Sequence, residues 1–438
     1  MKLRIDGRGA PLHGCLTPPG DKSISHRALI LASLAGGRSR ITGLLDSADV
    51  RATAEACRQL GATVRAEDDS VWVEGTGTAG LKPPSAPLDM GNSGTALRLL
   101  AGVLAAQPFA SELIGDASLS RRPMRRIVEP LSRMGAHIET AEGGTAPLRI
   151  TGNPKLKGIE YRPAVASAQI KSCVLLAGLY ASGRTCVIEP QLSRDHTERM
   201  LPLFGTPVEE PCCVTGGGRL RAADVVVPAD ISSATFFLVG AAMLEGSDVL
   251  LRGVGLTPTR DGILHVLERM GAAVEHRETR RHGTETVADL RVAHAAGLRG
   301  IDVPEEWIPS LIDELPAIMA LAAVAEGTTR IRGAAELRVK ESDRIAVMAR
   351  GLETLGVTVQ EFDDGIDITG GPVTGGTVDG AGDHRCAMSF CMLAQRASGP
   401  VTVTGAHHID TSYPDFVAHV QALGGTVEVL LAEADGHD

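Results

Sequence analysis

The sequence predicts an α/β protein built from six similar units, because of a repeated short motif and a composition rich in glycine but poor in aromatic residues. The motif is an apolar helix end, then glycine, then the start of a β-branched strand. Of 438 residues, 51 are glycine and only 3% are aromatic, which suits closely packed layers of small aliphatic side chains. The motif occurs six times, at Gly61, Gly135, Gly205, Gly271, Gly356 and Gly424.

Each copy of the motif predicts a helix that ends at a left-handed glycine and is followed by a strand. The segments 70–74, 147–151 and 365–369 lie downstream of three copies and are expected to be return strands. The third copy is the weakest, because Pro207 follows its glycine closely. A common helix ending is the alternative explanation, but the regular spacing along the whole chain argues against it. One such unit cannot bury both faces of its sheet, so we expect two groups of three.

The chain is expected to pass between the two groups at two places. Residues 225–233, VVVPADISS, break a strand at Pro228 and start a helix at Ser232 or Ser233. The Pro-Pro-Gly segment at 18–20 also stops regular structure. If the N-terminal strand joins the last three units, residues 1–20 and 228–438 form one domain and residues 21–227 form the other.

Charge and cysteine usage exclude several classes of function. The formal net charge is −10 and no Lys/Arg-rich run occurs, which disfavours nonspecific binding to nucleic acid or anionic lipid. The eight cysteines form neither a C-x-x-C pair nor a Cys/His cluster, which argues against a metal site and a disulfide framework. No segment has the apolar length of a signal peptide or a membrane span. We therefore expect a soluble, cytoplasmic protein.

Two expected helix starts near the N-terminus combine cations or glycine with small polar residues. Lys22 and Ser23 precede an apolar run, with Arg27 one turn further on, so N–H groups, a hydroxyl and an ammonium can meet an anion. An ordinary Ser23 N-cap beside an exposed lysine is the alternative. In the loop 89–98, DMGNSGTALR, Gly94 lets a ligand approach the backbone, although neither standard phosphate-loop pattern is present. A tight turn before a helix is the alternative there.

Further basic or small polar helix starts follow along the chain. Residues 120–126, SRRPMRR, place four arginines around one proline, and the planar guanidinium suits two-point contact with carboxylate or phosphate. A solvated helix surface is the alternative. Segments 166–172 and 192–196 are weaker candidates, and the polar quartet at 382–385 directly precedes an apolar helix.

The segment 337–344, LRVKESDR, mixes an acid with cations. If a helix starts at Glu341, then Lys340, Glu341 and Arg344 share its first turn, where a carboxylate can transfer a proton beside cations that hold a phosphate. A surface salt bridge is the alternative. The dipoles of these helix starts can point at one place, which predicts a site for a small phosphorylated or carboxylated ligand.

Taken in order, these motifs resemble the 3-phosphoshikimate 1-carboxyvinyltransferase (EPSP synthase) family over essentially the whole chain. The matching segments are GDKSISHR (20–27), GNSGTALR (91–98), RRPM (121–124), ASAQIKS (166–172), SRDH (193–196), IDE (312–314), RVKESDR (338–344) and DHRCAMSF (383–390). The resemblance implies a two-domain inside-out α/β barrel, with three βαβαββ repeats in each domain and the active site in the interdomain cleft.

The implied reaction transfers the enolpyruvyl group of phosphoenolpyruvate (PEP) to the 5-hydroxyl of shikimate 3-phosphate and releases phosphate, in the chorismate route to aromatic amino acids. Addition of the hydroxyl gives a tetrahedral intermediate, which then loses phosphate, and two proton transfers are needed. The resemblance implies no metal and no organic cofactor. It also implies a monomer that has these two small-molecule substrates, with glyphosate as a possible inhibitor.

The family motifs imply a role for several residues of this chain. Asp313 would be the base near the 5-hydroxyl. Glu341 would be the proton donor to the PEP methylene, and Lys22 would assist this proton transfer. The residues implied to hold shikimate 3-phosphate are Lys22, Ser23, Arg27, Ser167, Ala168, Gln169, Arg194, Asp313 and Lys340. Those implied to hold PEP are Lys22, Gly94, Arg122, Gln169, Arg344 and Arg385.

Three positions differ from what some relatives carry. Some members have two serines where this chain has Ser167 and Ala168, so one hydroxyl contact to phosphate is lost. The segment 409–414, IDTSYP, lacks a lysine that some members place there to contact PEP. Glyphosate-tolerant members carry alanine at the position of Gly94, so we expect glyphosate to compete with PEP in this protein.

Two other functions stay open at the level of sequence. The related enolpyruvyl transferase that acts on UDP-N-acetylglucosamine carries Lys-Asn at positions 22 and 23 and a cysteine near Arg122, whereas residues 114–126 contain no cysteine. A noncatalytic anion-binding relative would be favoured by loss of Asp313 or Glu341, and both acids are present.

Overall fold

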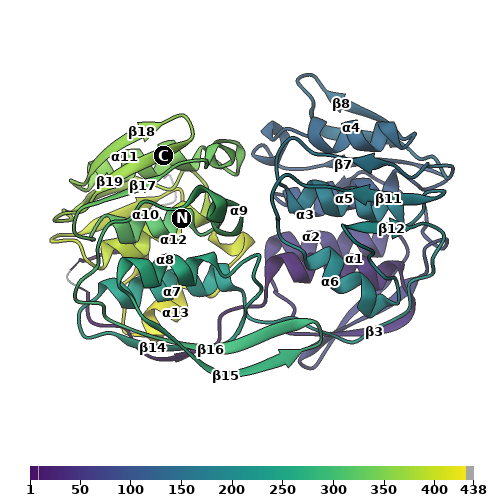
Figure 1. Ribbon diagram of the computed structural model, residues 1–438. Coiled ribbons are helices and arrows are strands. Elements are labelled where there is room, and N and C mark those ends of the chain that lie inside the picture. The colour runs from purple at the N-terminus through teal and green to yellow at the C-terminus, as the bar shows by residue number, and fades with distance from the viewer. Residues whose placement is uncertain (8, 431–438) are drawn as a thin grey trace, which may run out of the picture. The chain divides into compact units, whose positions relative to one another are not determined.

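A computed structural model describes residues 1–7 and 9–430, which fold as two compact units (Figure 1). The first unit comprises residues 1–19, 229–280 and the described residues from 285 onward. The second comprises residues 20–228 and 281–284. Each unit has its own hydrophobic core and contains both helices and sheets, which confirms the predicted α/β class.

The second unit contains three sheets in its described residues. Their strand orders are β13-β3-β5-β4 (Val225–Val226, Gly36–Thr42, Ser70–Thr76, Thr63–Glu67), β6-β7-β9-β8 (Leu88–Asp89, Ala110–Ile114, Thr145–Thr151, His137–Ala141) and β10-β11-β12 (Glu160–Tyr161, Arg184–Val187, Cys213–Thr215). Its α-helices are α1 (Lys22–Leu34), α2 (Ala48–Gln59), α3 (Gly94–Leu104), α4 (Arg125–Arg133), α5 (Ala168–Gly178) and α6 (His196–Met200).

The first unit also contains three sheets in its described residues. Their strand orders are β20-β21-β1-β22 (Gly376–Asp379, Val401–Thr404, Lys2–Ile5, Glu428–Leu430), β15-β16-β14-β2 (Val274–His282, Glu285–Ala293, Asp248–Gly255, His13–Leu16) and β17-β19-β18 (Thr328–Ile331, Gly365–Thr369, Thr358–Phe362). Its α-helices are α7 (Ile231–Met243), α8 (Gly262–Met270), α9 (Ile308–Leu311), α10 (Leu315–Ala322), α11 (Arg344–Thr354), α12 (His384–Ala394) and α13 (Phe416–Ala422).

Three helices form the centre of each unit because their sequences are apolar around most of the circumference. In the first unit, every residue of α7, α10 and α12 is buried, and the three helices pack against one another. In the second unit, α3 packs against both α1 and α5, and these helices are also buried over most of their length. A helix that is apolar on all sides belongs in an interior. The starts of these central helices carry most of the motifs noted in the sequence.

All six motif glycines adopt positive φ, between 82° and 104°, which confirms the predicted left-handed helix ends. Strands follow five of them, namely β4, β8, β15, β18 and β22. The return strands are confirmed as β5, β9 and β19. After Gly205 the chain forms no strand until β12, because Pro207 lacks the N–H group that a strand ladder uses.

The helix after the second passage between units begins at Ile231, slightly before the predicted Ser232 or Ser233. Asp230 is its N-cap, and its Oδ1 accepts the N–H of Ser232 at 2.8 Å. No helix within 1–7 and 9–430 combines the length and the apolar character that a membrane span requires.

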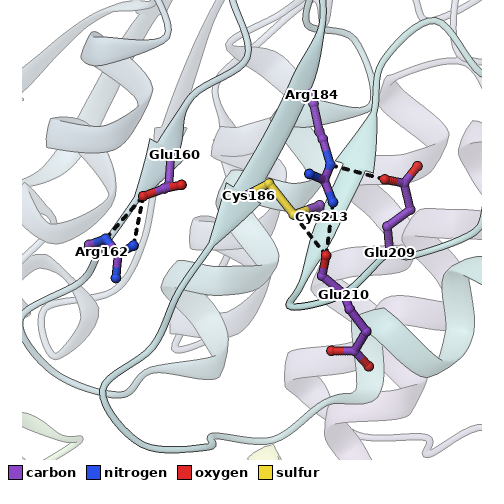
Figure 2. The surroundings of a disulfide bond; sticks show 7 residues. All are labelled: Glu160, Arg162, Arg184, Cys186, Glu209, Glu210 and Cys213. Atoms are coloured by element: carbon purple, nitrogen blue, oxygen red, sulfur yellow. Dashed lines mark hydrogen bonds and ion pairs between the residues drawn. A yellow bond between two sulfur atoms is a disulfide. The ribbon is translucent and has the colours of Figure 1, made fainter.

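A disulfide joins Cys186 on β11 to Cys213 on β12 (Figure 2). The prediction that the chain has no disulfide is therefore wrong for this pair. The two cysteines are register partners on antiparallel strands, although they lie 27 residues apart in the sequence. Only strand pairing brings them together, so their spacing in the sequence carries no signal. Arg184 of β11 also contacts the segment before β12, since it donates to the Glu210 carbonyl at 2.9 Å and lies 3.1 Å from a Glu209 carboxylate oxygen.

Candidate active site

Arg344 is the centre of a carboxylate cluster in the first unit. Its guanidinium donates from Nε to Asp383 at 2.8 Å, from Nη1 to Asp313 at 3.2 Å and from Nη2 to Glu341 at 2.7 Å. The Arg344 side chain is only 1% exposed. Burial by itself lowers the pKa of this guanidinium, but the carboxylates of Asp383, Glu341 and Asp313 raise it well above its ordinary value. The cluster therefore keeps one permanent positive charge among three acids.

The helix α11 begins at Arg344, so the condition considered from the sequence, a helix start at Glu341, is not met. Asp343 is the N-cap, and its Oδ1 accepts the N–H of Ala346 at 3.0 Å. An aspartate cap defines the helix start more strongly than the preceding charged residues do. Glu341 lies before the cap and still reaches Arg344. Because Arg344 is buried, the alternative of a surface salt bridge does not apply.

Asp313 lies in the turn between α9 and α10 and faces two arginines. Besides Arg344, it meets Arg385, whose Nη1 donates to the Asp313 carbonyl at 3.1 Å and whose Nη2 lies 3.8 Å from Oδ2. Arg385 is in the first turn of α12, where Asp383 is the N-cap and accepts the Arg385 N–H at 2.9 Å. Asp383 thus orients both arginines, and both arginines face Asp313.

Lys340 directly precedes Glu341 and is half-buried. Burial is the main influence on the pKa of its ammonium and lowers it below the ordinary value, with Arg344 acting in the same direction. The carboxylates of Asp313, Glu336 and Glu341 oppose that shift. Lys340 therefore belongs to the same electrostatic cluster as Asp313 and Glu341.

Glu314, the neighbour of Asp313, is an anchor that the sequence analysis missed. It is 1% exposed and accepts a hydrogen bond from the Ser232 hydroxyl at the start of α7. Arg260 donates to the same hydroxyl and lies 3.0 Å from Asp230. This buried network fixes the turn that carries Asp313 to the start of a central helix.

In the second unit, α1 begins at Lys22 after the N-cap Asp21, whose Oδ1 accepts the N–H of Ile24 at 2.8 Å. Ser23 is therefore not the N-cap, and that alternative is wrong. The Lys22 ammonium lies 3.0 Å from Oδ2 of Asp49, with the lysine side chain 16% exposed. Lys22 and Ser23 are thus the first two residues of the helix, where N–H groups point outward.

Arg27 is buried and holds α1 to two neighbouring segments. Its Nη1 donates to the Ser23 carbonyl at 2.9 Å. Its Nε donates to the Thr197 hydroxyl at 2.8 Å, and its Nη2 donates to the Ser172 hydroxyl at 2.7 Å. Those hydroxyls belong to α6 and α5, so Arg27 brings three helices of the expected phosphate site together.

His26 is a second residue that the sequence analysis missed, although it lies inside the first motif. Its Nδ1 is 2.7 Å from the Thr53 hydroxyl of α2, and its Nε2 is 3.4 Å from the Ser93 hydroxyl before α3. Burial, and then Lys22 and Arg27, hold the pKa of this imidazole well below its usual range. His26 is therefore neutral at pH 7 and connects three helices.

Gly94 is the first residue of α3, after the N-cap Ser93. A Cβ atom at Gly94 would lie 2.8 Å from Nη1 of Arg98 and 3.2 Å from Nη1 of Arg122. The absence of a side chain thus makes room for two guanidinium groups at the helix start.

Arg122 and Gln169 lie in the same part of the second unit. Arg122 is 6% exposed and donates to Oδ1 of Asn92 at 2.6 Å, so a solvated helix surface does not describe it. Gln169 accepts from Arg98 at 2.5 Å and donates to the Thr95 hydroxyl at 3.0 Å. These bonds join the start of α5 to the start of α3 and bring Gly94, Arg122 and Gln169 into one neighbourhood.

Ser167 and Arg194 lie on two segments that one carboxylate connects. Ser167 is the N-cap of α5, and its N–H donates to Glu189 at 3.1 Å. Ser193, the neighbour of the half-buried Arg194, donates from its hydroxyl to Glu189 at 2.6 Å. Glu189 therefore links the segments 166–172 and 192–196, the two weaker candidates in the sequence.

Comparison with known proteins identifies the family. A family model described as EPSP synthase (3-phosphoshikimate 1-carboxyvinyltransferase) matches residues 7–420. The chain belongs to this family. The family predicted from the sequence is therefore confirmed.

Curated relatives of the EPSP synthase family match nearly the full length. A protein named 3-phosphoshikimate 1-carboxyvinyltransferase from Halorhodospira halophila is 56% identical over 426 residues, with 96% of each chain covered. A protein of the same name from Methylococcus capsulatus is 53% identical, with 97% of this chain and 98% of the relative covered.

Solved structures give the same assignment. An EPSP synthase from Acinetobacter baumannii superposes with a TM-score of 0.86 at 46% identity, covering 98% of this chain and 99% of the other. The enolpyruvyl transferase NikO from Streptomyces tendae has a TM-score of 0.77 at 20% identity and 98% coverage of both chains, which supports the fold alone.

The residues implied by the EPSP synthase motifs are divided between the two units. Those in the second unit are Lys22, Ser23, Arg27, Gly94, Arg122, Ser167, Ala168, Gln169 and Arg194, and those in the first are Asp313, Lys340, Glu341, Arg344 and Arg385. In the first unit, hydrogen bonds link Arg344 to Asp313 and Glu341, and Arg385 to Asp313. In the second unit, Arg27 donates to the Ser23 carbonyl, and most of the other members bond to residues outside the set. In residues 1–7 and 9–430 no group of three His, Cys, Asp or Glu side chains is placed to hold a metal ion.

Proposed function

We propose that this protein transfers the enolpyruvyl group of PEP to the 5-hydroxyl of shikimate 3-phosphate, giving 5-enolpyruvylshikimate 3-phosphate and phosphate. The observation that carries the proposal is the buried cluster in which Asp313 and Glu341 share the guanidinium of Arg344. It occurs in a chain that matches EPSP synthases over nearly its whole length.

The reaction needs one group that takes a proton and one that gives a proton. Asp313 is the base for the 5-hydroxyl, because two arginines stabilise its carboxylate form before substrate binds. Glu341 is the donor to the methylene carbon of PEP. Its hydrogen bond to Arg344, a residue proposed to hold PEP, supports this role. Lys22 supplies positive charge and assists proton transfer.

The two substrates are held by cations and by helix starts. Shikimate 3-phosphate is bound by Lys22, Ser23, Arg27, Ser167, Ala168, Gln169, Arg194, Asp313 and Lys340. PEP is bound by Lys22, Gly94, Arg122, Gln169, Arg344 and Arg385. Backbone N–H groups at helix starts favour anions, and arginine adds two-point contact with carboxylate or phosphate. The enolpyruvyl group then passes through a tetrahedral intermediate that loses phosphate.

The proposal includes a division of the chain into two domains, residues 1–20 with 228–438 and residues 21–227. Each is an inside-out α/β barrel of three βαβαββ repeats, and the active site lies in the cleft between them. The two compact units support this division, since each has three central helices and three sheets in its described residues. Closure of such a cleft around its substrates excludes water from the reaction.

The enzyme acts as a cytoplasmic monomer in this proposal, without a cofactor, a nucleic-acid partner or a membrane partner. The net charge of −10 supports the lack of a nucleic-acid or lipid partner. Glyphosate is the expected inhibitor, in competition with PEP.

Phosphate release from the purified protein tests the proposed function. We expect release with PEP and shikimate 3-phosphate together, and none with either substrate alone. UDP-N-acetylglucosamine replaces shikimate 3-phosphate in a parallel reaction, because the related transferase uses that acceptor. Release with the sugar nucleotide, or no release from folded protein with any pair, would overturn the proposal.

A further inference from the structure

We propose that Glu189 is a positioning residue that sets the affinity for shikimate 3-phosphate by holding two phosphate-binding segments in one arrangement. The inference rests on the proposed function. Glu189 follows β11 and lies outside the residues that the family motifs implied. It acts through Ser167 and Arg194 and does not itself contact substrate.

The Glu189 carboxylate accepts three hydrogen bonds from two separate segments. Oε1 accepts the N–H of Ser167 at 3.1 Å and the hydroxyl of Ser193 at 2.6 Å, and Oε2 accepts the N–H of Ser193 at 3.3 Å. Ser167 is the N-cap of α5, and Ser193 directly precedes Arg194. One carboxylate therefore sets the distance between a helix start and an arginine.

Lys171 makes this carboxylate compatible with burial. Its ammonium lies 2.8 Å from Oε2 of Glu189 and 2.6 Å from Oε1 of Glu198, and it donates to the Ser193 carbonyl at 3.4 Å. The side chains of Lys171 and Glu189 are only 3% and 5% exposed. Burial lowers the pKa of the ammonium, but Glu198 and Glu189 raise it overall, so Lys171 stays charged. Lys171 and Glu189 therefore form a buried ion pair rather than a surface one.

The arrangement matters because a phosphate must meet both segments at once. The start of α5 offers N–H groups near Ala168 and Gln169, and Arg194 offers a guanidinium from the other segment. Ala168 has no hydroxyl to compensate for a misplaced arginine. Small displacements of groups that bind one ligand together reduce affinity strongly, so a supporting residue can control it.

The test compares Glu189→Gln with Glu209→Gln. Glutamine has the size of glutamate but lacks its charge and one acceptor oxygen, so Glu189→Gln weakens the link between the segments. We expect KM for shikimate 3-phosphate to rise about 10- to 100-fold, the effect of losing a hydrogen bond to a charged group. We expect kcat and KM for PEP to change less than about threefold. Glu209→Gln changes an exposed carboxylate that pairs with Arg184 of β11, away from Lys171, and all its constants should stay within about threefold of the parent.

Calorimetric titration of shikimate 3-phosphate into the protein without PEP gives a readout independent of turnover, and Kd should rise in parallel with KM. Equal increases in KM for both substrates, or a lower unfolding midpoint with unchanged KM, would contradict the inference. If Glu189→Gln does not fold, Glu189→Asp keeps the charge but shortens the side chain, and the same selective loss is expected. A parent protein without turnover would instead contradict the proposed function, whereas an active parent and unaffected variants would contradict only the positioning role.

Discussion

Arg344 Nη1 lies 3.2 Å from Asp313 Oδ1, and the same guanidinium holds Glu341 with a different nitrogen. The two acids therefore share one cation without sharing an atom. An amide in place of either carboxylate keeps the size of the side chain and leaves the other ion pair intact. The roles of the two acids can thus be examined separately.

Asp313→Asn and Glu341→Gln should each reduce kcat by at least about 100-fold, because each variant loses one proton-transfer group. Binding of shikimate 3-phosphate should weaken far less, since the groups expected to hold its phosphate are unchanged. Phosphate release measures the first effect and calorimetric titration the second. Glu353→Gln, an exposed position at the other end of α11, is the control. Near-normal turnover in either acid variant would refute its assigned role.

Glyphosate should inhibit the parent protein competitively with PEP. In Gly94→Ala the added methyl group would lie 2.8 Å from Arg98 Nη1, so that guanidinium must move. We expect higher values of both the glyphosate inhibition constant and KM for PEP, with a smaller rise in KM for shikimate 3-phosphate, because the same Arg98 nitrogen donates to Gln169. Gly36→Ala in the same unit is a suitable control, because its Cβ meets nothing closer than 3.9 Å. Inhibition that does not depend on PEP concentration would argue against this prediction.

The stability of the second unit should depend on pH through His26. Its pKa in the folded protein lies well below the ordinary value of 6.5, first because of burial and then because of Lys22 and Arg27. Unfolding restores the ordinary value, so below about pH 6.5 the unfolded chain binds a proton that the folded chain does not. The free energy of unfolding is therefore unaffected by His26 protonation above that pH. Below it, the free energy of unfolding falls by up to about 1.4 kcal/mol per pH unit.

Urea unfolding of the parent and of His26→Gln between about pH 5 and pH 8 checks this linkage. The dependence of the free energy of unfolding on pH should be shallower in the variant below about pH 6.5. The pKa values of His407 and His419 are also lowered, mainly by burial. Both residues are present in the variant, so their contribution to the pH dependence of unfolding is the same in the two proteins. Parallel curves for the two proteins would show that His26 is not the group responsible.

Loss of the Cys186–Cys213 disulfide should destabilise the second unit. The bond closes a loop across a sequence separation of 27 residues. In the chain-entropy model, a loop of that length corresponds to about 3.5 kcal/mol. Cys213→Ser should lower the unfolding midpoint. Reductant should lower the midpoint of the parent to a similar value and leave the midpoint of the variant unchanged. Cys15→Ser removes an exposed free thiol and serves as the control. A parent midpoint that is insensitive to reductant would count against the bond.

Local features of the fold could be predicted from the sequence because they depend on nearby residues. A glycine after an apolar helix end is enough to set a left-handed turn, and all six such glycines adopt it. The start of α11 could not be decided from the charged segment alone, because the position of the N-cap, Asp343, does not follow from the pattern of charges. The disulfide was missed because only the pairing of β11 with β12 makes Cys186 and Cys213 neighbours.

The supporting residues of the site could not be placed from the sequence because their partners are distant along the chain. Glu314 meets Ser232, and His26 meets Ser93, only in the folded protein. Lys171 is the exception in principle. A single lysine inside an otherwise apolar helix is rarely buried without an acidic partner, so α5 alone contains a signal for a buried ion pair.

The pairing of β1 with β22 places Lys2 opposite Leu430, so positions near the two ends of the described chain are neighbours in one sheet. A linker could join these positions, and new termini could be opened between Pro19 and Gly20, where the chain passes between the units. In such a circular permutant, residues 20–228 come first, and the rest of the chain follows as one continuous segment. Apart from 281–284, each unit would then be encoded by an uninterrupted stretch that can be produced separately and mixed to test whether the halves assemble into an active pair.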